Sequence, residues 1–362
     1  MRCNEYVKKA FKYSDKRPRN KDTHTGIRIR RIEACTFKMR AIQAFFIIFV
    51  FVHLACGWKL TGIKRDLVWK GADCVSEEAE NLVQDSNVLL RRGEFVSALN
   101  LPSYRIDEIE AVSNDAGVTL DQALSMRKQS LVTKITMTSG RLRRELDNVK
   151  KDWQSGTDIL KVSKTYDLPP VSIIRAILLE QVRLSHPTWY ESDIKKLTKR
   201  LIQSGERHNY LANDSTGEQL ILAKLKDQSS YTDPASMERD AASSWEQSLY
   251  SFLDLNSINY VKEEVLFGQA ATPDVLLLDD VRVNGSLIRW IDSKNYFGSG
   301  SAASYHFIKK LKKQITKYDM EFEGNGAIVY RLNYSKSLET NINQKCLLLD
   351  KGPLTDIAVE EV

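Results

Sequence analysis

The sequence predicts an α/β protein in which a helical domain precedes a mixed sheet flanked by helices. Residues 103–205 repeat apolar side chains at helical spacing, as Ile106, Ile109 and Val112 do at its start. From Asp240 onward, helical and strand patterns alternate instead. Alternation of that kind is typical of a sheet that carries helices on its faces.

The helical domain is predicted to contain a helix-turn-helix-like pair. Arg141–Trp153 reads as a charged helix, followed by helices at Thr157–Tyr166 and Val171–Leu184. Asp167–Pro170 separates the last two, because proline closes one helix and is tolerated in the first turn of the next. Arg175 on the second helix is a candidate nucleic-acid contact. Most helical hairpins are packing units, however, and the apolar residues of this helix favour packing over DNA recognition.

The sheet is predicted from a hairpin and the segments around it. Asn284-Gly285 is a strong signal for a two-residue hairpin turn. A preceding amphipathic helix carries Trp245, Leu249 and Phe252 on one face. The remaining elements are strands at 259–267, 274–278, 287–294, 327–332 and 346–349, and a helix at 302–318.

Basic and acidic residues are distributed unevenly along the chain. Residues 1–40 hold 13 Lys/Arg and 4 Asp/Glu, whereas the remaining 322 residues hold 40 and 43. The net charge of +6 therefore belongs to the amino-terminal extension and says little about the folded part. We expect four segments: a basic extension at 1–90, a helical helix-turn-helix-like domain at 91–205, a connecting segment at 206–239 and an α/β domain at 240–362.

An apolar run lies within the expected extension. Ala41–Trp58 is at the short end of the length that spans a bilayer, and from Met39 it also resembles a signal peptide. We expect a buried helix or a segment outside the functional protein. A membrane anchor or a secretory signal is the alternative.

Two aspartates and a lysine are predicted to meet at one edge of the sheet. Asp292 and Lys294 alternate on a strand, so they share a face, with Ile288 and Trp290 behind them. The hairpin brings Asp274, at the start of the partner strand, beside Asp292. Asp-x-Lys alone would indicate only a surface ion pair; the upstream Pro-Asp, the hairpin and the helix that follows favour a site.

The chemistry of this pattern is phosphodiester hydrolysis. A divalent cation held by carboxylates and assisted by a lysine can supply the nucleophilic water, neutralise the phosphorane and help the leaving oxygen. The five cysteines form no Cys-x-x-Cys pair and the five histidines no ligand pair, which argues against zinc. We therefore expect Mg²⁺, or Mn²⁺, on oxygen ligands.

Flanking helices offer further site residues. Glu246, on the helix before the sheet, is a candidate third metal carboxylate. On the helix after it, Lys310, Gln314 and Tyr318 share one stripe because they are spaced by four. The candidate contacts to a phosphate backbone on this helix are Lys309, Lys310, Lys313 and Lys317.

These motifs resemble the codanin-interacting nuclease family. The resemblance rests on Thr272-Pro273-Asp274, on Leu287–Gly298 and on Gly326–Tyr330, and it extends upstream to Tyr166–Gln181. That family carries a "TPD" motif and is similar to archaeal Holliday-junction resolvases of the PD-(D/E)XK superfamily. The likeness covers about residues 100–340.

The resemblance implies roles for individual residues. Asp274 and Asp292 would be metal ligands, Glu246 the acid of the first helix and Lys294 the catalytic lysine. Gln314 and Tyr318 would match a Q-x-x-x-Y motif of resolvase-like nucleases. Asp292 stands where the family is expected to have Glu, and residues 1–90 have no recognised counterpart.

Three functions remain open at this point. The first is a metal-dependent PD-(D/E)XK endonuclease that acts on nucleic acid, structured or branched DNA above all. The second is a nuclease fold kept as a scaffold for a protein partner, and the third is a helix-turn-helix DNA-binding regulator. The family resemblance further implies a codanin-like partner, a nuclear and cytoplasmic location and a role in red-cell development; a homodimer is expected by analogy with resolvases.

Overall fold

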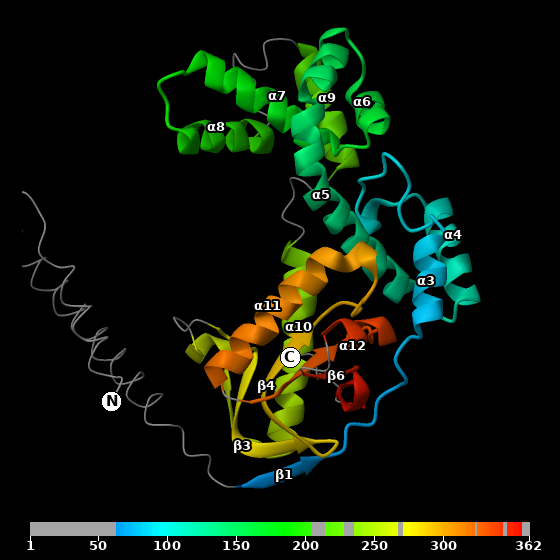
Figure 1. Ribbon diagram of the computed structural model, residues 1–362, viewed down its shortest axis with the longest axis vertical. Coiled ribbons are helices and arrows are strands. Elements are labelled where there is room, and N and C mark those ends of the chain that lie inside the picture. Colours follow the sequence, from blue (N-terminus) through cyan, green and yellow to red (C-terminus); the bar gives the residue numbers. More distant parts are fainter. Residues whose placement is uncertain are drawn as a thin grey trace, which may run out of the picture. The chain divides into compact units, whose positions relative to one another are not determined.

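The computed structural model of the chain describes residues 63–204, 214–227, 235–266, 271–322, 324–342 and 346–356. Within these residues six strands form one mixed sheet in the order β1-β3-β4-β5-β6, with β2 also paired to β3 (Figure 1). β3 is antiparallel to β2 and β4, and the other neighbours are parallel. The predicted α/β class is confirmed at this level. The strands are β1 Lys64–Leu67, β2 Tyr260–Lys262, β3 Val275–Val283, β4 Ser286–Lys294, β5 Gly326–Tyr330 and β6 Leu347–Leu349.

The predicted hairpin joins β3 to β4. Asn284 and Gly285 have φ angles of 48° and 83°, and a tight two-residue turn with positive φ at both centres favours Asn-Gly. Asn284 also fixes a distant segment, since its Oδ1 accepts a hydrogen bond of 2.8 Å from Trp69 N. The turn therefore anchors the chain that follows β1 as well as the hairpin itself.

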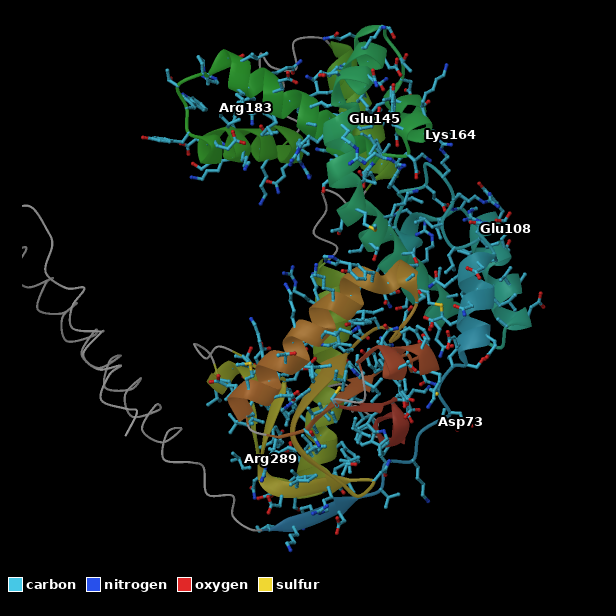
Figure 2. The ribbon with its side chains drawn as sticks, in the orientation of Figure 1. Asp73, Glu108, Glu145, Lys164, Arg183 and Arg289 are labelled. Atoms are coloured by element: carbon cyan, nitrogen blue, oxygen red, sulfur yellow. The ribbon has the colours of Figure 1, made fainter. Side chains whose placement is uncertain are left out.

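The β3–β4 register shifts between Leu276 and Val281, so β3 contains extra residues opposite Arg289. Arg289, labelled in Figure 2, forms an ion pair of 2.9 Å with Asp280 at this irregularity. The shift interrupts the alternation of β4. Ile288 packs in the cluster that contains α10 residues, whereas Trp290 packs on the α11 side, so the prediction that both lie behind Asp292 was wrong for Ile288.

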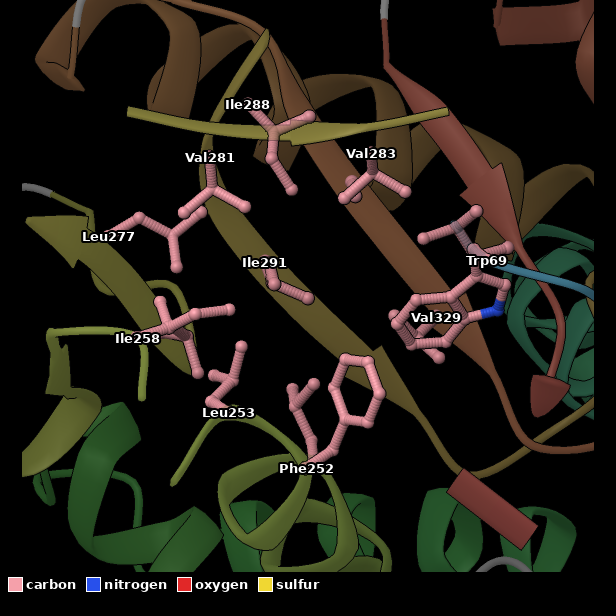
Figure 3. Close-up of a cluster of buried hydrophobic side chains, with 14 of the residues drawn as sticks. Trp69, Phe252, Leu253, Ile258, Leu277, Val281, Val283, Ile288, Ile291 and Val329 are labelled. Atoms are coloured by element: carbon pink, nitrogen blue, oxygen red, sulfur yellow. The ribbon is translucent and has the colours of Figure 1, made fainter. Parts of the chain in front are cut away.

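One face of the sheet is covered by α10 (Ala235–Leu255). Figure 3 shows its Phe252 and Leu253 gathered with Leu277, Val281 and Ile291 in a buried cluster. Trp69 belongs to the same cluster and meets Phe252 edge-on, with ring centroids 5.2 Å apart. This core holds α10, and with it Glu246, against the two strands of the hairpin.

The other face is covered by α11 (Tyr305–Phe322), which follows the short turn η5 (Ala302–Ser304), and by α12 (Lys336–Ile342). Every third or fourth residue of α11 is buried against Trp290 and its neighbours on the sheet. These residues are Ile308, Leu311, Ile315 and Tyr318. The short turns η4 (Glu263–Leu266) and η6 (Gly352–Asp356) complete this part of the chain.

Helices α3 to α9 make up the helical region. The longest is α5, which has 35 residues and begins with a capping box between Thr119 and Gln122. Near its start, Gln129 Nε2 donates to Phe297 O at 2.6 Å, in the loop after β4. The helices are α3 Glu77–Asp85, α4 Ser103–Asp115, α5 Leu120–Gln154, α6 Ile159–Tyr166, α7 Pro170–Ser185, α8 Glu191–Ser204 and α9 Asp214–Lys226, with η2 at Ala98–Asn100.

The predicted pair of helices around a tight turn is α6 and α7. Asp167 ends α6 in the left-handed conformation, with φ 52°, and Pro170 opens α7. Most apolar side chains of α7 are buried, and Arg183 (Figure 2) pairs with Glu191 of α8 at 3.0 Å. These contacts are those of a packing unit. A role of this pair in DNA recognition stays a prediction.

The segment boundaries differ in two places from those expected. β1 and α3 lie within residues 64–85, so the folded part starts well before residue 91. Helix α9 lies inside the expected connecting segment, and α10 begins at Ala235. The apolar run 41–58 lies outside the described residues, and among those that are described no helix is long and apolar enough to span a membrane.

Candidate active site

The hairpin places Asp274 next to Asp292. Val275 pairs with Ile291 in the antiparallel register, so the residues one step outward on each strand are neighbours. Asp274 Oδ2 accepts two hydrogen bonds from Ser293, at 2.6 Å from its N–H and at 2.7 Å from its hydroxyl. This side of Asp274 is therefore fixed to the strand that carries Asp292.

Asp292 is 2% exposed and is held from the α11 side. Its Oδ1 lies 3.2 Å from Tyr318 Oη and 3.3 Å from Gln314 Nε2. Gln314 also donates to Tyr318 Oη at 2.7 Å, and Tyr318 Oη lies 3.0 Å from Thr272 O. The Gln-x-x-x-Tyr pair thus orients Asp292 and connects α11 to the residue before Pro273.

Lys294 lies on the same face and forms an ion pair with Asp292 Oδ2. Burial acts against its charged form, but the charges of Asp292 and Asp274 prevail and raise the pKa of Lys294 above its ordinary value. The ammonium group is consequently kept charged beside the two carboxylates.

Glu246 lies on α10 and adds negative charge near the site. In the described part of the chain it forms no hydrogen bond with Asp274 or Asp292. Burial raises the pKa of the Glu246 carboxyl, and the charges of Glu263 and Asp292 raise it further. Within the part of the chain that the structure describes, no three His, Cys, Asp or Glu residues are grouped closely enough to hold a metal ion together. The role of Glu246 as a third metal carboxylate stays a prediction.

Asp274 is strongly perturbed. Burial, followed by repulsion from Asp292, raises the pKa of Asp274 to about 7, while Lys294 and the hydrogen bonds from Ser293 act in the opposite direction. The buried carboxylate of Asp292 and the half-buried carboxylate of Asp274 together carry more negative charge than the single ammonium group of Lys294 neutralises. A cation at this position would relieve that repulsion.

The oxygens that remain fit a hard divalent cation. Asp292 Oδ2 is buried, accepts no hydrogen bond of ordinary geometry from a described residue and faces only the Lys294 ammonium. Asp274 Oδ2 is occupied by Ser293, and no hydrogen bond to its Oδ1 is found among the described residues. Mg²⁺ is often held by one or two carboxylates together with water and substrate phosphate. Asp274 and Asp292 are the residues that would hold it.

Sequence reasoning missed three participants. Ser293 fixes Asp274, and Thr272 contributes its carbonyl to the Tyr318 network. Glu263 of η4 accepts a hydrogen bond of 2.8 Å from the Thr272 hydroxyl. Ser293 lies inside the Asp-Ser-Lys motif, but nothing in the sequence indicates that its hydroxyl reaches back to Asp274.

The predicted basic contacts separate into two groups. The four predicted lysines of α11, at positions Lys309, Lys310, Lys313 and Lys317, are all exposed. Arg175 is exposed on α7, in the helical region, and not on α11. The structure therefore brings together Asp274, Asp292, Lys294, Gln314 and Tyr318.

Comparison with known proteins identifies relatives of this chain. Residues 213–352 match a family described as "Protein of unknown function TPD sequence-motif". The "CDAN1-interacting nuclease 1" of Danio rerio is 25% identical over 211 residues, which are 55% of this chain and 63% of that protein. The protein of the same name from Xenopus laevis is 34% identical over 90 residues, 25% of this chain and 28% of that protein.

The chain thus spans less than two thirds of the length of the curated relatives it matches. No solved structure matches it. The region matched by the family description contains Asp274, Asp292, Lys294, Gln314 and Tyr318. The predicted resemblance to the codanin-interacting nuclease family is confirmed, and the PD-(D/E)XK type stays a prediction.

Proposed function

We propose, from the confirmed resemblance of this chain to the codanin-interacting nuclease family, that it is a metal-dependent nuclease of the PD-(D/E)XK type. The observation that carries the proposal is the convergence of Asp274, Asp292 and Lys294, held by Gln314 and Tyr318. Two acidic ligands and one lysine, on neighbouring strands, are the groups that phosphodiester hydrolysis requires.

Each residue of the proposed site has a task that its position supports. Asp274 and Asp292 would hold Mg²⁺ or Mn²⁺, which when bound supplies a nucleophilic water and charge neutralisation at phosphorus. Lys294 would stabilise negative charge that develops on the phosphoryl oxygens. Gln314 and Tyr318 keep Asp292 Oδ1 engaged, so that Oδ2 stays directed at the reacting groups.

Substrate, partner and location belong to the same proposal. The substrate is nucleic acid, and structured or branched DNA is the form that the likeness to resolvases favours. The printed names of the relatives suggest a codanin-like partner. A homodimer and a nuclear and cytoplasmic location follow only from the family and stand as expectations.

A scaffold function is the second candidate, and two observations favour it. Lys294 and Asp292 satisfy each other in an ion pair, and Glu246 stands apart from the aspartates. Such a site would be stable without a cation and would leave the fold free to bind a protein partner. A DNA-binding regulator is less favoured, since α7 buries its apolar residues.

Cleavage of a substrate panel distinguishes these functions. Branched, flap, duplex and single-stranded DNA and RNA are incubated with the purified chain in Mg²⁺, in Mn²⁺ and in excess chelator. We expect cleavage of at least one substrate that requires the cation. No cleavage of any substrate, together with tight binding of a codanin-like protein, would establish the scaffold instead.

A further inference from the structure

A cavity lies on the flank of α11 that faces away from the site. It has a volume of about 570 Å³ and is lined by residues of η5, α11 and α12. We call it the α11–α12 pocket, and its principal residues are Gly300, Tyr305, Lys309, Lys312, Lys313 and Asn341.

Helix geometry separates this pocket from the aspartates. With 3.6 residues per turn, Tyr305 and Lys312 project roughly 160–180° around the axis of α11 from Gln314. Gln314 contacts Asp292, whereas Asn341 of α12 borders the pocket. The α11–α12 pocket is therefore a separate site on the opposite flank of one helix.

The pocket carries three positive charges that are not neutralised. Lys309, Lys312 and Lys313 are exposed, and no ion pair with a described residue is found for any of them. Among the described residues, none that lines the cavity is acidic. Lys336 of α12 differs, because it pairs with Glu339. Three free ammonium groups around one cavity favour an anion with several oxygens.

The floor of the pocket is rigid. Gly300 N donates to the buried Glu80 carboxylate at 3.1 Å and lies 3.0 Å from Ser335 Oγ. Asn341 Nδ2 donates to Gly300 O at 2.8 Å. A Cβ atom at Gly300 would lie 2.2 Å from Leu338 N, so only glycine allows this approach of α12. The lysines therefore surround a fixed backbone.

Tyr305 adds an aromatic surface at the rim. It is 57% exposed, and Lys309 Nζ lies 5.8 Å from its ring centroid. An exposed aromatic ring beside lysines is the arrangement that binds single-stranded nucleic acid, because the ring stacks on an unpaired base while the lysines contact the backbone. A base inside a duplex is already stacked and cannot reach such a ring.

We propose that the α11–α12 pocket binds an unpaired segment of nucleic acid, with phosphates on Lys309, Lys312 and Lys313 and a base on Tyr305. This inference rests on the proposed function, since it makes the substrate a nucleic acid with a single-stranded part. It specifies the substrate class: a flap, tail or unpaired junction arm rather than a blunt duplex.

The test measures binding apart from cleavage. A labelled oligo(dT) of about 12 nucleotides and a blunt duplex of equal length are titrated with the full chain in excess chelator, at several salt concentrations. The triple variant Lys309→Gln, Lys312→Gln, Lys313→Gln should bind oligo(dT) at least about tenfold more weakly, with a salt slope lower by about 2. Tyr305→Ala should weaken oligo(dT) about 5- to 150-fold and leave the slope and the duplex unaffected.

The matched control removes equal charge elsewhere: Lys64→Gln, Lys70→Gln, Lys351→Gln, all exposed. It should bind oligo(dT) like the parent. Equal losses in both triple variants, an unchanged affinity in the pocket variant, or competition by poly-glutamate as strong as by oligo(dT) would each overturn the proposal. Failure of the proposed nuclease function is distinguished separately. If the parent binds oligo(dT) through the pocket but cleaves no substrate, the pocket proposal stands and the nuclease proposal fails.

Discussion

In each aspartate of the candidate site, one carboxylate oxygen accepts hydrogen bonds from neighbouring residues and the other accepts none from the described residues. Asp274 commits Oδ2 to Ser293, and Asp292 commits Oδ1 to Gln314 and Tyr318. The other oxygen of Asp292 faces Lys294. An amide in place of Asp292 would keep the hydrogen-bonded side and remove the anionic one, so the charge can be tested without removing the contacts.

Asp292→Asn should therefore abolish cation-dependent cleavage and leave the fold intact. Asn retains an oxygen for Gln314 and Tyr318 but no longer offers a negatively charged ligand. Cleavage rate and circular dichroism measure the two effects. Asp193→Asn is the matched control, because Asp193-Ile194-Lys195 repeats the tripeptide on α8, and it should cleave normally. Activity of Asp292→Asn in Mg²⁺ equal to that of the parent would refute the assignment.

Lys294→Met should reduce turnover far more than binding. Met keeps the apolar stem and removes the charge, and losing one preorganised electrostatic donor costs about 2.7–4 kcal/mol of barrier, roughly a hundred- to a thousandfold in rate. Binding is measured in Ca²⁺ and cleavage in Mg²⁺. Lys195→Met, at the exposed lysine of the corresponding tripeptide on α8, serves as the control. Equal losses of binding and cleavage would make Lys294 only a backbone contact.

Asp274 makes stability depend on pH in the cation-free protein. Its pKa is about 7, above the ordinary 3.8, so the folded state binds the proton more tightly than the unfolded state. Stability contributed by the protonated form is lost as pH rises through the window between these values. Urea unfolding in chelator should show this fall, and Asp274→Asn should make it shallower. An identical pH profile in the variant would contradict the shift.

Sequence reasoning found the five converging residues because each follows from a short-range rule. Asp292 and Lys294 alternate on one strand, Gln314 and Tyr318 lie one helical turn apart, and the Asn-Gly turn defines the partner of Asp274. The contacts of Ser293 and Glu263 depend on distances of a few ångströms between separate elements. No spacing in the sequence encodes such distances.

At the scale of elements, the turn between α6 and α7 is fastened to the rest of the helical region by Asp167. Its carboxylate accepts from Gly93 N at 2.7 Å and pairs with Lys134 of α5 at 2.7 Å. Burial acts to raise the pKa of Asp167, but Lys134 and the Gly93 hydrogen bond prevail and lower it. The charged form is thus favoured by folding.

Asp167→Asn should destabilise the protein by about 1–3 kcal/mol at neutral pH. Asn tolerates the left-handed conformation, so the loss reports the charge rather than backbone strain. Because the pKa is depressed, the contribution is present above the ordinary value of 3.8 and is lost as pH falls through the lower, folded-state pKa. Urea unfolding at neutral and acidic pH measures this. Asp147→Asn, on the exposed side of α5, should change the free energy of unfolding little. Equal destabilisation by both substitutions would show that the Asp167 carboxylate does not stabilise the turn between α6 and α7.

Two elements could not be predicted, for different physical reasons. β1 is four residues long and its first three side chains are charged, so it has no apolar pattern and becomes a strand only by pairing with β3. The shift inside β3 lies where its partner on that edge changes, since β2 pairs with its first half and β1 with its second. Helix α9 was not predicted because polar, turn-like residues precede and follow it in the sequence.

At the scale of the whole molecule, the sheet begins earlier in the chain than the α/β pattern does. Ile63 O accepts a hydrogen bond of 3.1 Å from Asp280 N, and β1 continues the sheet from Lys64. Trp69 is 6% exposed, and its indole N–H lies 3.2 Å from Asp350 O. Residues 63–69 therefore belong to the same fold as Asp274, although some two hundred residues separate them from it in the sequence.

Deletion of residues 1–60 should leave both thermal stability and cleavage in vitro unchanged. The basic excess of the chain lies in residues 1–40, and the pairing of β1, the packing of Trp69 and the aspartate pair are all formed by residues after position 60. Deletion of residues 1–70 is the matched control. It removes β1 and Trp69, and loss of a buried tryptophan costs about 3–5 kcal/mol, so this longer deletion should melt at a clearly lower temperature. If both deletions lower the melting temperature equally, residues 1–60 contribute to the fold; if the shorter one retains stability but loses cleavage, the basic extension takes part in binding the substrate.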